Sequence, residues 1–179
     1  PSTTVDYLHR VESEITMTLI EPSDESKFLR FDFDNTILTS RIIREKFPPY
    51  ETIIPPSFAY QALIPINDLL DTVRRISLSS YRISKAVIFN FSGNSLLVSA
   101  ENDETGESAE ETIQCEFMGE DLRIGVRYDY ILQSLQHINE EIANDDMIEL
   151  LFNGPQKAYI ICQKEKMDEF LMLNMPVRI

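Results

Sequence analysis

The sequence predicts an α+β fold in which β-α-β-β-β units repeat and their strands form antiparallel sheets. The first observation is a recurring order of elements, a strand, a helix and three further strands, at a spacing of about 60 residues. The second is strand-like runs that alternate apolar and polar residues, as in an antiparallel sheet with one exposed face. A repeat of this length exceeds that of common solenoids and fits the duplicated halves of one domain. Two packed units would form two outer antiparallel sheets with two helices on the other side.

The first segment has the pattern of a unit that lacks its opening strand. Residues 3–11 place apolar residues at helical spacing. Three strand-like runs follow at residues 14–20, 27–33 and 36–43. Asp34 and Asn35 suit a tight hairpin turn between the last two strands. Because the chain opens on Pro1 and on an incomplete unit, we expect it to be a piece of a longer protein.

A proline-rich stretch, residues 47–57, follows this segment. Its four prolines remove backbone donors and favour an extended chain, and they are Pro48, Pro49, Pro55 and Pro56. An extended linker between domains is the expected structure. We therefore place a boundary near Ser57, with one domain portion at 1–57 and a complete domain at 58–179.

Two complete units are predicted after the linker. In the first, Pro65 begins a helix over 67–78 that carries its apolar residues on one face. The strands of that unit are expected at 60–64, 86–91, 95–100 and 110–118. The second unit combines a helix at 128–138 with strands at 122–126, 147–152, 157–162 and 170–176.

The composition indicates a folded protein without bulk attraction for nucleic acid. The chain is 43% hydrophobic and carries a formal net charge of −14, whereas counterion release from DNA requires clustered Lys and Arg. The sequence predicts neither a membrane span nor a signal peptide, and we expect a cytoplasmic location. Cys115 and Cys162 lie far apart in apolar runs, which predicts buried free thiols.

One motif raises an enzymatic alternative. Asp32-Phe33-Asp34-Asn35-Thr36 is similar to the DxDxT nucleophile loop of haloacid-dehalogenase-type phosphatases, in which the first Asp attacks phosphorus and the second is a general acid. That fold requires a parallel, doubly wound sheet. Here the residues on both sides of the motif alternate between apolar and polar, as in an antiparallel hairpin. A hairpin is therefore the preferred interpretation.

The other polar clusters predict no metal or catalytic site, and no cofactor is expected. Asp145 and Asp146 lie in a polar turn between a helix and a strand. The acidic run 101–111 lacks the ligand spacing of a calcium loop and is expected at a solvated hairpin tip. His9 and His137 are single histidines on helices, without a catalytic partner at a recognisable spacing.

Three arginines on the predicted helices, Arg10, Arg74 and Arg75, are the candidates for contacts with DNA phosphates. Such sparse basic residues suit a helix that faces a duplex without reading its bases. The apolar run 171–179, interrupted by Pro176, is expected to pack against the protein or to form part of a binding surface.

Several runs of the sequence carry a resemblance to a known family. Residues 35–43 are followed by Lys46-Phe47-Pro48-Pro49-Tyr50 and Ile53-Ile54-Pro55. Together these runs resemble the segment of bacterial sliding clamps, the beta subunits of DNA polymerase III, that closes the middle domain and enters the third. Residues 99–111 resemble the clamp's acidic hairpin, and residues 119–132 resemble the strand and helix after it. The ending Met175-Pro176-Val177-Arg178-Ile179 resembles the terminal Met-Pro-(Met/Val)-Arg-(Leu/Ile) of the family. The runs follow the family's order across nearly the whole chain.

The resemblance implies the DNA clamp fold, with helices on the inner face of a ring, and no active site. Residues 1–57 would be the second half of the middle domain and 58–179 the third domain. A groove between these domains would capture partner peptides, usually with a Gln and an apolar Leu/Phe pair. Its lining residues here would be Pro48, Thr52, Ile53, Tyr130, Met175, Pro176, Val177 and Arg178. Position 52 is often Arg in relatives, so Thr52 departs from the pattern.

The same resemblance implies the partners of the whole protein. They would be double-stranded DNA, held topologically and without sequence preference, and the replicative polymerase, the clamp loader and other proteins bound through short peptides. The full-length subunit would form a head-to-tail homodimer. Two alternatives stay open from the sequence, namely the phosphatase and a generic peptide-binding adaptor without a DNA role.

Overall fold

The computed structural model describes residues 2–23, 26–43, 45–47, 49–141, 147–164 and 166–179. The chain divides into two compact units, Pro1–Pro48 and Pro49–Ile179. The predicted boundary near Ser57 falls within the second unit, because Ile54 and Phe58 pack against Leu151, Ile160 and Cys162 of that unit.

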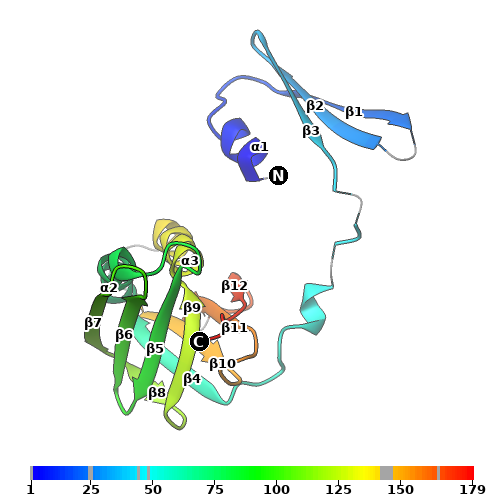
Figure 1. Ribbon diagram of the computed structural model, residues 1–179. Coiled ribbons are helices and arrows are strands. Elements are labelled where there is room, and N and C mark those ends of the chain that lie inside the picture. The colour runs from blue at the N-terminus through cyan, green and yellow to red at the C-terminus, as the bar shows by residue number, and fades with distance from the viewer. Residues whose placement is uncertain (1, 24–25, 44, 48, 142–146, 165) are drawn as a thin grey trace. The chain divides into compact units, whose positions relative to one another are not determined.

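The first unit is a short helix packed on a three-stranded antiparallel sheet (Figure 1). It consists of α1 (Ser2–Leu8), β1 (Thr16–Ser23), β2 (Ser26–Phe33) and β3 (Thr36–Arg41), with strand order β1-β2-β3. Tyr7 of α1 places its ring 6.1 Å from that of the buried Phe33. The hairpin turn at Asp34 is confirmed, and Asp34 adopts a φ of 47° that Asp tolerates better than most residues.

The second unit contains two antiparallel sheets and two helices. The first repeat comprises β4 (Tyr60–Pro65), α2 (Ile66–Ile76), β5 (Ala86–Ser92), β6 (Ser95–Asn102), β7 (Glu107–Gln114) and β8 (Glu116–Met118). The second comprises β9 (Leu122–Arg127), α3 (Tyr128–Glu141), β10 (Met147–Phe152), β11 (Tyr159–Gln163) and β12 (Leu171–Asn174). Short 3₁₀ turns occur at η1 (Tyr50–Thr52) and η2 (Ser77–Ser79). The predicted α+β class with repeated units and antiparallel sheets is therefore confirmed.

The two repeats exchange their first strands. One sheet has the order β12-β11-β10-β4-β8 and the other the order β7-β6-β5-β9. Thus β4 of the first repeat pairs with β10, and β9 of the second pairs with β5. Neither repeat can complete its sheet without the other.

The apolar core lies between these sheets and beneath the helices, which pack against each other (Figure 1). The α2 helix buries Leu69, Val73 and Ile76, which lie on one face at the spacing of a helix. Phe91 lies at the centre of an aromatic group, with ring centroids 4.9 Å from Phe117 and 5.4 Å from Phe152. Such contacts anchor both sheets to one core.

The structure corrects two predicted elements. Residues 110–118 do not form one strand, because the chain leaves β7 at Cys115 and enters the other sheet as β8. Residues 47–57 are not uniformly extended, since Thr52 Oγ1 donates a 2.7 Å hydrogen bond to the Pro49 carbonyl and the Ile53 amide donates to Tyr50. Proline is compatible with the start of a helical turn, so the prolines did not exclude η1.

The two cysteines are buried and free, as predicted. Burial, with a further contribution from nearby Glu149, raises the pKa of the Cys162 thiol to about 12. The protonated thiol is therefore a small apolar group at neutral pH.

We expect the first unit to open more readily than the second. The side chains of β1 are almost all exposed, whereas alternate residues of β5 and β6 are fully buried. In hydrogen exchange of the 179-residue chain, amides of β1–β3 should be protected about tenfold less than those of β5 and β6. Equal or greater protection in β1–β3 would contradict this ranking.

Candidate functional site

The C-terminal segment crosses from the edge of one sheet to the edge of the other. After β12 ends at Asn174, the Val177 amide donates a 2.9 Å hydrogen bond to the Gly125 carbonyl on β9. Asn174 Nδ2 also donates to Ser134 Oγ of α3 at 3.3 Å. This segment is the second repeat's counterpart of β8, because each contacts the first strand of its own repeat. Pro176 has no amide hydrogen and so cannot donate to a ladder of the kind that β8 forms.

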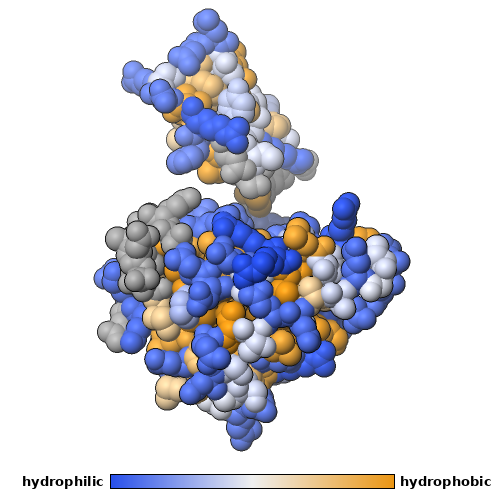
Figure 2. Space-filling model, turned by 90° about the vertical axis from the view of Figure 1, so that its left-hand side faces the viewer, coloured by the Kyte–Doolittle hydropathy of each residue, from blue (hydrophilic) through white to orange (hydrophobic). Residues whose placement is uncertain are grey.

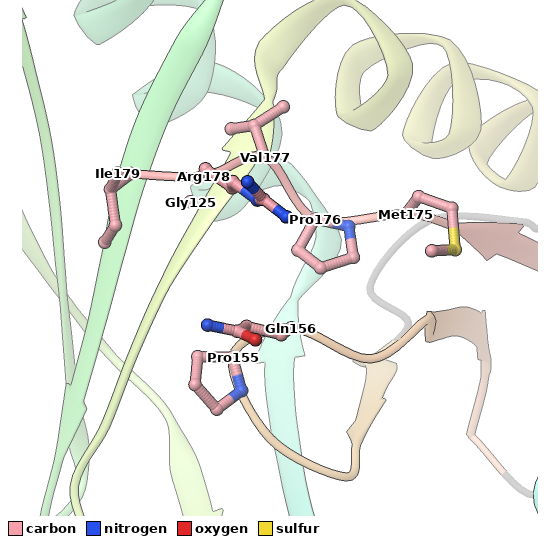
Figure 3. Close-up of a pocket in the computed structure, with 8 residues that line it drawn as sticks. All are labelled: Gly125, Pro155, Gln156, Met175, Pro176, Val177, Arg178 and Ile179. Carbon is pink, nitrogen blue, oxygen red and sulfur yellow. The ribbon is translucent and has the colours of Figure 1, made fainter.

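A pocket of about 520 Å³ lies beside this segment (Figure 3). Pro155 and Gln156, from the loop between β10 and β11, lie across it from the terminal residues. Its full lining is Gly125, Pro155, Gln156, Met175, Pro176, Val177, Arg178 and Ile179. The lining is mostly apolar with a few polar groups, which is the composition of sites that bind small molecules or peptide side chains.

Four of the eight predicted groove residues thus lie together, namely Met175, Pro176, Val177 and Arg178. The other described ones do not line this pocket. Thr52 lies in η1 and Ile53 directly after it, with Ile53 exposed, while Tyr130 lies in the first turn of α3. Pro48 lies outside the described residues.

Sequence reasoning missed Gly125, Pro155, Gln156 and Ile179. Gly125 carried a usable signal, because glycine inside a strand often marks the close approach of another backbone. A methyl group added there would lie 2.5 Å from Ile179 Cγ2 and 2.8 Å from the Val177 carbonyl oxygen. Pro155 and Gln156 carried no such signal, because their position depends on how β10 and β11 place the loop.

Next to Tyr130, charged side chains form a compact cluster. Arg127 donates two hydrogen bonds to Asp129, at 3.0 and 2.7 Å, and Lys85 Nζ donates to the same carboxylate at 3.0 Å. The hydrogen bonds from Arg127, aided by Lys85, lower the pKa of Asp129 to about 2 despite partial burial. The Arg127 guanidinium lies 4.3 Å from the centroid of the Tyr130 ring.

The arginines predicted to face DNA have different surroundings. Arg75 on α2 binds Glu111 of β7 through two hydrogen bonds of 3.0 and 2.6 Å, and these bonds lower the pKa of Glu111. Arg74 forms a 3.3 Å ion pair with Asp71 one turn earlier on the helix. Arg10 lies in the first unit, beside a shallow depression that Tyr7 also lines.

The phosphatase motif does not have the surroundings that this chemistry requires. Asp32 lies on β2 of an antiparallel sheet, and hydrogen bonds from Arg30 lower the pKa of its carboxyl group. Asp34 occupies the adjoining hairpin turn. The motif is therefore part of a hairpin and not a nucleophile loop. Asp145 and Asp146 lie outside the described residues. None of the described helices is long and apolar enough to cross a membrane.

Replacing Gly125 with Ala should displace the C-terminal segment. The added methyl group meets the Val177 backbone, which cannot move aside as a flexible side chain can. We expect loss of protection at the Val177 amide and changed chemical shifts for residues 175–179, with the core strands intact. Gly93→Asn is the matched control, because Gly93 has a φ of +54° that Asn tolerates and open space around it. Unchanged protection at Val177 in Gly125→Ala would contradict the expectation.

Replacing Asp129 with Asn should destabilise the second unit by roughly 1–2 kcal/mol at pH 7, since the lowered pKa reflects net stabilisation of the carboxylate. The folded-state pKa of about 2 lies below the usual 3.8, so this stabilisation is complete above about pH 4 and is lost as the pH falls toward 2. Urea unfolding of both proteins between pH 7 and pH 3 measures the difference. Asp103→Asn at the exposed hairpin tip is the control, and a difference independent of pH would count against the assignment.

Comparisons with known proteins agree with this architecture. The family model described as DNA polymerase III beta subunit, C-terminal domain, matches residues 51–178. The beta sliding clamp of Haemophilus influenzae is 30% identical over 124 residues, covering 65% of this chain and 34% of the relative. That of Chlamydia muridarum is 23% identical over 179 residues, covering 100% of this chain and 46% of the relative.

Solved structures show the same fold. The DNA polymerase III subunit beta from Pseudomonas aeruginosa matches with a TM-score of 0.76 at 22% identity, over 100% of this chain and 47% of that one. The subunit from Borrelia burgdorferi matches with a TM-score of 0.71 at 22% identity, over 100% and 46%. The chain spans less than half the length of each of these four proteins. The match over residues 51–178 places it in a family: this chain belongs to the beta subunits of DNA polymerase III, the beta sliding clamps.

Proposed function

We propose that this chain is the C-terminal part of a bacterial sliding clamp, the processivity factor that encircles DNA and holds the replicative polymerase on its template. The observation that carries the proposal is the match of residues 51–178 to the clamp's C-terminal domain. The function of such a protein is topological, and it has no active site of its own. The predicted cytoplasmic location is part of the same proposal.

We assign residues 1–57 to the second half of the middle domain and residues 58–179 to the third domain. The two exchanged repeats from β4 to β12 support a complete domain in the second portion. In the first portion, one helix followed by three strands supports half of such a pair.

The peptide groove is proposed around the terminal pocket. Short peptides gain affinity from a few apolar anchors in a preformed site, and a flexible thioether lets one wall accept different partners. Met175, which is 61% exposed beside the pocket, is suited to be that wall. We propose that Pro48, Thr52, Ile53 and Tyr130 complete the groove, and that polymerase and clamp-loader peptides are its ligands.

Contact with double-stranded DNA is proposed to be local and weak. The net charge of −14 opposes bulk attraction, and Arg74 and Arg75 already have carboxylate partners. These arginines and Arg10 would meet phosphates only transiently, while the closed ring retains the duplex.

Head-to-tail association is supported by an edge of the second unit. Strand β7 is the outer strand of its sheet, and such an edge is open to pairing with another chain. Nearby, Leu78 and Ile83 are 83% and 79% exposed and line one depression together with Glu107 of β7. Figure 2, viewed from the side on which β7 and α2 lie in Figure 1, shows hydrophobic areas between hydrophilic ones. We propose this edge as the surface that meets the first domain of the next subunit.

Deleting residues 175–179 should weaken capture of partner peptides by roughly thirtyfold or more and leave the domain folded. Loss of one wall of such a site typically costs about 2 kcal/mol or more, roughly a thirtyfold loss of affinity. The measurement is titration of a Gln-Leu-containing polymerase peptide into the full-length protein and its truncated form, with circular dichroism as the control for folding. Equal affinities would refute the groove, and an unfolded truncated protein would assign these residues to the core.

Retention on DNA distinguishes the clamp from a generic adaptor. The full-length protein, loaded by its clamp loader on nicked circular DNA, should remain bound until the circle is linearised. An adaptor would bind the peptide without such retention.

A further inference from the structure

Tyr130 is exposed, yet its ring is held from one side. Its side chain extends from the first turn of α3, with 44% of its surface accessible. The Arg127 guanidinium lies over the ring at 4.3 Å from the centroid, a distance at which cation–π attraction is effective. One face of the ring is thereby covered.

Arg127 is itself fixed in place. Its Nε and Nη2 atoms both bind the Asp129 carboxylate, so the planar guanidinium has a set orientation. Asp129 in turn accepts hydrogen bonds from Lys85 and, at 3.1 Å, from the Tyr130 amide. Lys85 adopts a φ of 52° immediately before β5, and its carbonyl accepts a 2.9 Å hydrogen bond from the Tyr128 amide. The cluster therefore ties the start of β5 to the junction between β9 and α3.

A fixed ring is useful on a binding surface. An exposed aromatic side chain loses rotamer freedom when a partner packs on it, and this loss opposes binding. A ring already held in one orientation loses less rotamer freedom on binding, so the partner binds more tightly. Attraction between a cation and a ring at an exposed site changes an equilibrium by about two- to fivefold.

We propose that Arg127 is a positioning residue of the peptide groove, which holds Tyr130 as a platform for an apolar side chain of the partner peptide. This inference rests on the proposed function, because it requires that Tyr130 contacts the peptide. Arg127 acts through the ring, and its own contact with the peptide is not required.

A double-mutant cycle tests the inference. A fluorescently labelled Gln-Leu-containing polymerase peptide is titrated into the full-length protein and into Arg127→Met, Arg127→Lys, Tyr130→Leu and the Arg127→Met/Tyr130→Leu double variant. Arg127→Met should weaken binding about two- to fivefold and Arg127→Lys less, because lysine keeps the cation but not the fork. In the Tyr130→Leu background, Arg127→Met should have no further effect.

The matched control is Arg30→Met. Arg30 also binds a carboxylate two residues later on the chain, that of Asp32. This change should leave peptide affinity unaltered, and thermal unfolding verifies that every variant is folded.

Each outcome has one meaning. Equal effects of Arg127→Met with and without Tyr130, or no effect at all, would overturn the positioning role while the clamp assignment stands. If Tyr130→Leu binds the peptide as the wild type does, the proposed role of Tyr130 as a platform is wrong. If the wild-type protein does not bind the peptide, the proposed groove fails and this inference fails with it.

Discussion

The exchange of first strands between the two repeats is the constraint on which the second unit depends. Because β4 completes the sheet of β10–β12 and β9 completes that of β5–β7, neither repeat forms a satisfied sheet alone. The exchange also places both connections from strand to helix, at Pro65–Ile66 and Arg127–Tyr128, beside the partner repeat. The adjacency of α2 and α3, the shared aromatic core and the position of Tyr130 all follow from it.

The same duplication explains why a pocket forms at the C-terminus. On one side of the sheets the chain crosses at Cys115 and pairs as β8 with its own first strand through a regular ladder. On the other side the equivalent crossing contains Pro176, and the segment makes one bridge to Gly125. The first strand of one repeat is therefore paired with a regular strand, and that of the other contacts a loosely paired segment with space beside it. The two ends of this duplicated framework therefore differ in structure, and Pro176, which lacks an amide hydrogen, lies where they differ.

Much of this fold could be predicted from sequence, because alternation and helical spacing report directly on burial. The hairpin at Asp34, the helix begun by Pro65 and the strands of both repeats followed from local patterns. The break between β7 and β8 at Cys115 could not be predicted from sequence. The residues on both sides of it favour strands, and only the strand with which they pair changes. For the site, the terminal Met-Pro-Val-Arg run was identifiable by resemblance. The partners of Arg75 and Arg127 could not be predicted, because they depend on which side chains the sheets bring within reach. The places of Pro155 and Gln156 in the pocket could not be predicted either, because they depend on how a loop folds back.

The pairing of Arg75 with Glu111 has a consequence for motion along DNA, if α2 faces the duplex as proposed. A free arginine that meets a phosphate gains a full ion pair at each step and must lose it before the next. An arginine that already has a carboxylate exchanges one partner for another, so the net change in free energy is small. Barriers to one-dimensional diffusion along the phosphates would then stay low. If the proposed ring forms, internal ion pairs of this kind would keep the resistance to its movement along DNA small.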